Sequence, residues 1–189
     1  MTHHMTRRAV LAGAAGTGLL GVAGCTAVSG SERRGAKIDQ RVDAALNYLN
    51  SNVDGAADLV SRASGMLIMP LVTEAGFGIG AAYGRGALRI GGTTADYYSA
   101  ASGSFGFQIG AQQYAHALFF MTEAALAEFR ASSGISVGGD LEYALTSRAG
   151  ALTVDTTTVT RPVIAVIFGQ AGLIAGATLE GTKYTRIFP

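Results

Sequence analysis

The sequence predicts an α+β fold in which a mostly antiparallel, strongly curved or barrel-like, glycine-rich sheet of about seven or eight strands is covered by about three helices. Three observations lead to this prediction. Apolar residues recur with helical spacing before Gly65 and with the two-residue spacing of strands after it. Glycine makes up 27 of the 189 residues, against an ordinary share of ~7%. The strand and helix alternation of a parallel sheet is absent from the pattern.

Two helices are predicted at the start of the domain. The apolar positions of the first fall on one helical stripe: Ile38, Val42, Ala45, Leu46, Leu49 and Val53. The run Asn50-Ser51-Asn52 is predicted to end it, and Asp54 is suited to cap a second, short helix. Both are expected to cover the sheet.

A third helix and the strands follow. Thr122 is suited to cap a helix that runs to Arg130, with Leu126 and Phe129 on its buried side. The expected strands are Met66–Met69, ended by Pro70, then 75–90, 96–121, 135–145, the apolar stretch 163–169 and two more after 170, with 146–161 a Thr-rich loop or strand.

One face of the stretch 75–90 carries almost no side chains. The residues of this glycine face are Gly76, Gly78, Gly80, Gly84 and Gly86. Glycine weakens a strand, so such a run needs a reason: close approach of another backbone, bulky rings packed across it, or a ligand. We favour close packing over a ligand, because small barrels fit large residues against small ones.

The N-terminal segment 1–24 has the layout of a signal peptide, with Arg7 and Arg8 before an uncharged apolar run that ends at Gly24. Its arginine pair resembles the twin-arginine export signal, and the run up to Cys25 resembles the lipobox of bacterial lipoproteins. The resemblance implies cleavage between Gly24 and Cys25 and attachment of acyl chains, such as palmitate, to Cys25. The alternative is a plain N-terminal helix with a buried cysteine.

Cleavage changes the composition of the chain. Removal of two arginines turns the formal net charge from +1 to −1 and leaves His116 as the one histidine of the mature chain. Residues 25–36 are expected to be a lipidated N terminus and tether, and residues 37–189 the domain. Because Thr26 rather than Asp follows Cys25, similarity to sorted lipoproteins favours the periplasmic face of the outer membrane.

The composition excludes several kinds of site. A single cysteine forms no internal disulfide, and one cysteine with three histidines argues against a multi-ligand zinc or iron–sulfur site, so no metal or cofactor is predicted. The sequence has no basic stripe with interleaved aromatic residues, so nucleic-acid binding is not predicted.

Some cations are candidates for contact with phospholipid headgroups. Arg85 and Arg89 share one strand face, and Lys183 and Arg186 lie in the last strand. A second group of basic residues lies at the start of the domain: Arg33, Arg34, Lys37 and Arg41. The alternative in both places is a set of solvated charges.

One motif suggests an enzyme. Gly134–Gly138 matches the Gly-x-Ser-x-Gly pattern of hydrolases around Ser136, and His116 with Asp96 could complete a triad. However, a helix precedes this motif and a strand follows it, which reverses the order that the nucleophile elbow needs. His116 is predicted to be a hydrogen-bonded surface histidine.

Several segments together resemble the SYLF domain family over residues 37–187. They are residues 66–70, the glycine-rich stretch 75–88, residues 97–102, 106–112, 118–130 and 171–187. The resemblance implies a non-enzymatic lipid-binding domain. Eukaryotic members bind phosphoinositides, and fungal and plant relatives also bind actin. This chain lacks the SH3 and FYVE partner domains of those members and carries an export signal, so neither role is transferred to it.

The combined prediction is an exported lipoprotein, anchored to membrane phospholipid through Cys25, whose domain binds phospholipid or an envelope partner without catalysis. Actin binding is not expected of an exported protein. Two alternatives remain open: a small periplasmic hydrolase that uses Ser136 and His116, and a purely structural envelope scaffold.

Overall fold

A computed structural model describes residues 30–132, 135–136, 143–146, 161–172, 179 and 181–189, with the backbone alone at 104–109, 135–136, 143–146 and 170–172. Its elements are α1 (Gly30–Asn52), α2 (Ala56–Arg62), β1 (Gly65–Ile90), β2 (Thr93–Phe120), α3 (Glu123–Ala131), β3 (Ile135–Ser136), β4 (Tyr143–Thr146), β5 (Val163–Gly172) and β6 (Lys183–Ile187). The described strands form one sheet in the order β3-β6-β2-β5-β4, and β1 pairs with β2.

The centre of the fold is one long antiparallel hairpin. β1 and β2 pair from Gly65 and Phe120 at its open end to Ile90 and Thr93 at its turn. On the other edge of β2, β5 pairs with residues 112–120 and β6 with residues 97–101. β2 therefore joins every part of the sheet.

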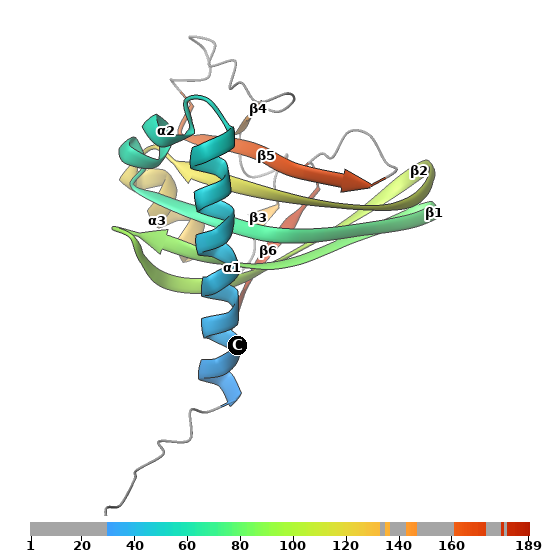
Figure 1. Cartoon of the computed structure of the whole chain (residues 1–189), viewed down its shortest axis with the longest axis horizontal. Helices are drawn as coiled ribbons and strands as arrows, with labels where there is room; N and C mark the ends of the chain where they lie inside the picture. Colours follow the sequence, from blue (N-terminus) through green and yellow to red (C-terminus); the bar gives the residue numbers. More distant parts are fainter. Residues whose placement is uncertain (1–29, 133–134, 137–142, 147–160, 173–178, 180) are drawn as a thin grey trace, which may run out of the picture.

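The hairpin turns back on itself at one end of the molecule (Figure 1). We call residues 76–80 the bend; it separates a proximal arm, residues 65–75 of β1, from a distal arm, residues 81–90. A Cβ on Gly76 would lie 2.5 Å from the Cα of Gly80, and Gly78 has a φ of 74°. This backbone requires glycine, because L side chains rarely adopt that φ and no side chain fits the approach.

The two arms of β1 then lie against each other at the glycine face. A Cβ on Gly86 would lie 1.9 Å from the carbonyl oxygen of Ile68, and one on Gly84 would lie 2.8 Å from that of Leu71. At these two positions the glycines allow close approach of a backbone, one of the reasons considered for the stripe.

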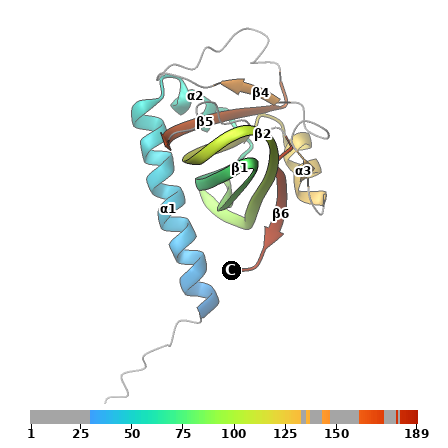
Figure 2. The same ribbon diagram turned by 90° about the vertical axis from the view of Figure 1, so that its right-hand side faces the viewer.

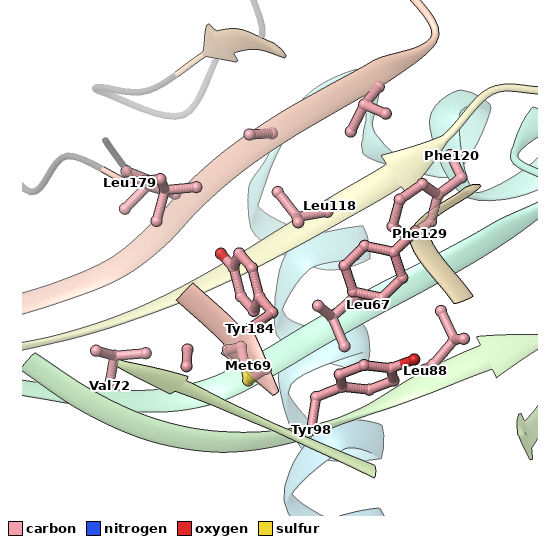
Figure 3. Packing of buried hydrophobic residues seen from close by; sticks show 14 of the residues in the cluster. Leu67, Met69, Val72, Leu88, Tyr98, Leu118, Phe120, Phe129, Leu179 and Tyr184 are labelled. Atoms are coloured by element: carbon pink, nitrogen blue, oxygen red, sulfur yellow. The ribbon is translucent and has the colours of Figure 1, made fainter. Parts of the chain in front are cut away.

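Two core clusters pack on opposite sides of the hairpin. The inner cluster includes Leu67, Met69, Leu118 and Phe120 of the hairpin, Phe129 of α3 and Tyr184 of β6 (Figure 3). The outer cluster joins α1 and α2 to Ile68, Ala87, Ala117 and Phe119. Figure 2 shows the result, with α1 along one side of the hairpin and α3 on the other.

The α+β class and the mostly antiparallel sheet are confirmed. The larger strand count and the strongly curved or barrel-like form are not confirmed: the described residues form six strands, and the sheet is not closed. One reason is that β1 continues past Pro70, with a register shift between Met69 and Val72 in place of an end. The sheet is also not wholly antiparallel, because β4 pairs with β5 in parallel.

The helices agree with the prediction except at the N-terminal ends of α1 and α2. The side chain of Thr122 accepts a hydrogen bond from the backbone N–H of Ala125, as expected of a cap. α1 already begins at Gly30, so residues 30–36, expected in the tether, are helical. α2 is preceded by Gly55 with a φ of 83° and no side-chain cap, and not by the predicted cap Asp54.

Candidate functional site

α1 carries its charges on separate flanks. Its buried stripe consists of Gly35, Ile38, Val42, Ala45 and Leu49. Successive helical residues are turned by about 100°, so Asp39 and Asp43 fall on one flank of this stripe. Arg34, Lys37 and Arg41, spaced i, i+3 and i+7, fall on the opposite flank.

The acidic flank fastens α1 to the sheet. The carboxylate of Asp39 accepts hydrogen bonds from Thr94 Oγ1 at 2.6 Å and from Tyr97 Oη at 2.7 Å. Arg89 Nη2 donates to Asp43 Oδ1 at 2.6 Å and lies 3.5 Å from Asp39 Oδ1. Burial, and then the neighbouring Asp39 carboxylate, raise the pKa of Tyr97 to about 12, so it stays a donor. The sheet thus supplies one cation and two hydroxyl donors to these two carboxylates, on the flank of α1 away from Arg34, Lys37 and Arg41.

The basic flank faces an open pocket of about 420 Å³ between α1 and β1. We call it the basic pocket; it is lined by Arg34, Lys37, Ile38, Arg41, Pro70, Leu71, Thr73, Tyr83, Gly84 and Arg85. Arg85 Nε donates to Tyr83 Oη at 2.9 Å, and its guanidinium lies 5.7 Å from the Tyr83 ring centroid. The described lining holds four cations and no carboxylate, so the pocket is suited to an anion.

An apolar groove of about 480 Å³ continues from the basic pocket along α1 and shares Arg41, Pro70 and Leu71 with it. The other residues that line the apolar groove are Ala44, Ala45, Tyr48, Ala115, Phe168 and Gly169. Tyr48 stacks on Phe168 with ring centroids 6.2 Å apart. Together the two hollows form a surface with a basic half and an apolar half.

The structure separates the cations that the sequence grouped as a headgroup patch. Arg85 alone of the four lines the basic pocket. Arg89 is bound to the acidic flank of α1. Arg186 lies 3.5 Å from Asp96 Oδ1 and donates to the carbonyl oxygen of Arg130, while Lys183 is exposed on β6. The placement of Arg85 beside the basic flank of α1 was not predicted, although the helical spacing of that flank was visible in the sequence.

His116 is not the surface residue that was predicted. Its side chain has no exposed area, and its Nε2 shares a 2.7 Å hydrogen bond with Tyr184 Oη. Burial lowers the pKa of His116 to about 3, so the imidazole is neutral. The backbone of Ser136 lies in β3, paired with Lys183. Asp96, the third member of the suggested triad, faces Arg130 and Arg186.

The predicted export and lipidation residues, Arg7, Arg8, Gly24 and Cys25, lie outside the described residues. Of the helices that the structure does describe, none combines the length and the apolar character needed to cross a membrane. Within the same described ranges, no group of three or more His, Cys, Asp and Glu side chains could hold a metal ion.

Comparison with protein families gives one match. Residues 101–186 match the family described as Ysc84, Las17-binding protein actin regulator, which is the SYLF family. The match covers most of β2 and continues into β6, while the cations of the basic pocket precede it. No curated protein matches the chain.

Proposed function

With a SYLF domain over residues 101–186, we propose that this protein is a non-enzymatic phospholipid-binding lipoprotein. In this proposal the basic pocket takes the phosphate group of an anionic phospholipid, and the apolar groove lies along the same membrane surface. The observation that carries the proposal is the basic pocket itself, in which Arg34, Lys37, Arg41 and Arg85 face one hollow without a carboxylate among its described lining residues.

Charge segregation on α1 supports this assignment. The mature chain has a side-chain charge of −1, which alone favours no anionic surface. Asp39 and Asp43 are turned to the opposite flank and bound by Arg89, Thr94 and Tyr97, so neither carboxylate lines the basic pocket. Each cation near an anionic membrane adds about 1 kcal/mol of attraction, and a hydrogen-bonded Arg offers a directed contact to phosphate.

The anchoring part of the proposal rests on the sequence. Export through the pair Arg7 and Arg8, followed by cleavage before Cys25, would place the protein in the cell envelope with its acyl chains in a membrane. Several acyl chains on one cysteine give stable anchoring, since one chain alone binds marginally. The described domain would then act at the surface to which it is tethered, on the periplasmic face of the outer membrane.

The proposal includes neither catalysis nor actin binding. A catalytic His116 would need to reach a substrate, whereas its side chain is buried and its Nε2 is already hydrogen-bonded to Tyr184. The family description names actin regulation, but an exported protein would not meet actin. A purely structural scaffold leaves the basic pocket without a role.

Vesicle co-sedimentation tests the headgroup site. The chain from Thr26 onward contains both core clusters and is suited to this assay, because it has no lipid anchor. We expect it to bind vesicles rich in phosphatidylglycerol. The double variant R41Q/R85Q removes two pocket charges and should weaken binding by about tenfold or more, at roughly 1 kcal/mol for each charge.

The matched control is R62Q/K183Q, which also removes two positive charges but from residues outside the basic pocket. It should keep most of the affinity. Equal losses in the two variants would reduce the interaction to general electrostatics and remove the basic pocket from the proposal. No binding of the unaltered chain to anionic or zwitterionic vesicles would refute lipid binding by the domain.

Mass spectrometry of membrane fractions tests the anchor. We expect a protein that begins at Cys25 and carries acyl chains on that residue. A Cys25→Ser variant should remain unprocessed, because the modified side chain is missing. An intact N terminus or an unmodified Cys25 in the natural protein would contradict the lipoprotein assignment.

A further inference from the structure

The bend of the hairpin exposes two large apolar side chains. Phe77 is 81% exposed and Ile79 is 68% exposed, with Gly78 between them. The backbone register places Phe77 opposite Ile109 and Ile79 opposite Phe105, so apolar residue types also occur on the partner strand. Exposed apolar residues are common singly, but a pair at the bend of a folded-over hairpin is unusual for a surface that meets only water.

Ile79 of the bend lies on the same strand face as two residues of the basic pocket. Alternate residues of a strand share a face, and Ile79 shares its face with Tyr83 and Arg85, which line the pocket. Further along this face, Ala87 is buried in the outer cluster beneath α1 and α2. α1 thus covers only one end of the face and leaves the rest open toward the bend.

Exposed apolar side chains are concentrated on this side. Among the described residues, the large apolar side chains that are exposed are Tyr48, Leu71, Phe77, Ile79, Tyr83 and Phe188. Tyr48, Leu71 and Tyr83 line the basic pocket or the apolar groove, and Phe77 and Ile79 lie at the bend of the same strand. Only Phe188, near the C-terminal end of the described chain, stands apart from this group.

We propose that the bend inserts Phe77 and Ile79 into the apolar layer of the bilayer whose headgroups occupy the basic pocket. The inference rests on the proposed headgroup binding and adds to it a second contact and an orientation. The occupant is a bilayer because one strand carries Arg85 at the basic pocket, Ile79 on the same face at the bend and the exposed Phe77 beside it. This order of charged and apolar groups is that of a lipid leaflet.

Insertion of the bend makes a large contribution to binding. Burial of one Phe or Ile side chain is worth about tenfold or more in a binding constant. The variant F77S/I79S should therefore bind vesicles of equal parts phosphatidylglycerol and phosphatidylethanolamine at least tenfold more weakly. Because both side chains are exposed, the variant should unfold at the same urea concentration as the unaltered chain.

A single tryptophan gives a direct measurement of insertion, since the chain contains none. In the variant F77W, made in the chain from Thr26 onward, emission should shift to shorter wavelength when these vesicles are added. Lipids with brominated acyl chains should quench it. The control is A127W, at an exposed position of α3 on the side of the hairpin opposite α1 (Figure 2), where neither change is expected.

The outcomes are distinguishable. Vesicle binding with unchanged F77W emission would overturn insertion and leave headgroup binding in place. Absence of any vesicle binding would overturn both proposals. Sedimentation velocity without lipid could instead show a dimer of the unaltered chain that the variant F77S/I79S does not form. That result would assign the bend to contact with a second copy of this chain, which also overturns insertion.

Discussion

The two faces of the distal arm of β1 are built from alternate residues and serve different purposes. On the inner face Gly84, Gly86 and Leu88 are buried, and the two glycines lie against the backbone of the proximal arm. On the outer face Tyr83 is exposed, and Arg85 lines the basic pocket. One strand therefore carries a close backbone contact on one face and an accessible surface on the other, which allows the surface to vary without loss of the core.

The largest expected effect is on the inner face. In G86A the added Cβ would lie 1.9 Å from the carbonyl oxygen of Ile68, so the arms of β1 must separate. We expect a loss of about 3 kcal/mol or more in the free energy of unfolding, measured by urea titration.

Two controls sharpen this contrast. In G103A the new Cβ meets no atom within 4 Å, so the same exchange should cost less than about 1 kcal/mol. R85Q, on the outer face next to Gly86, should change the free energy by less than about 0.5 kcal/mol. An unaltered free energy of unfolding in G86A would contradict the close approach of the two arms.

A smaller effect is expected from pH, again in the interior. His116 has a pKa of about 3 in the folded chain and about 6.5 when unfolded, so between these values the unfolded state binds more protons. Stability is therefore full above pH 6.5 and falls as the pH decreases below it. Between pH 7.5 and 5.5 the expected loss is about 1.4 kcal/mol, measured by urea unfolding at both values.

The variant H116Q isolates this contribution because glutamine is polar but does not titrate. Its decrease in stability between the same two pH values should be smaller by about 1.4 kcal/mol. Equal decreases in the two proteins would show that His116 does not resist protonation in the folded chain, which would contradict its complete burial beside Tyr184.

Much of the fold was readable from local patterns. The helical stripe of α1, the cap at Thr122 and the alternation along the distal arm are properties of neighbouring residues, and the structure shows all three. The continuation of β1 past Pro70 was not readable. Proline cannot donate to the ladder, which argues for a strand end, but here a register shift next to it lets the pairing resume.

The candidate site depended on tertiary placement. The sequence paired Arg85 with Arg89 because alternate residues share a face, yet their partners differ: Arg89 meets Asp43 of α1, and Arg85 meets Tyr83 at the open pocket. Which flank of α1 faces which strand is decided by the docking of Asp39 on Thr94 and Tyr97, residues more than 50 positions away. A one-dimensional pattern contains no such information.

β2 pairs with β1, β5 and β6, and this central position has a consequence for the folding pathway. The turn of the hairpin joins residues only three positions apart, Ile90 and Thr93, so its zipping is local and fast. The pairing of β2 with β6 joins Tyr97 to Ile187, ninety positions apart, and must await a costly loop closure. Until then residues 97–101 have an unpaired edge, a place where two folding chains could pair wrongly. The rate of folding should thus be limited by the pairing of the five residues of β6 with β2.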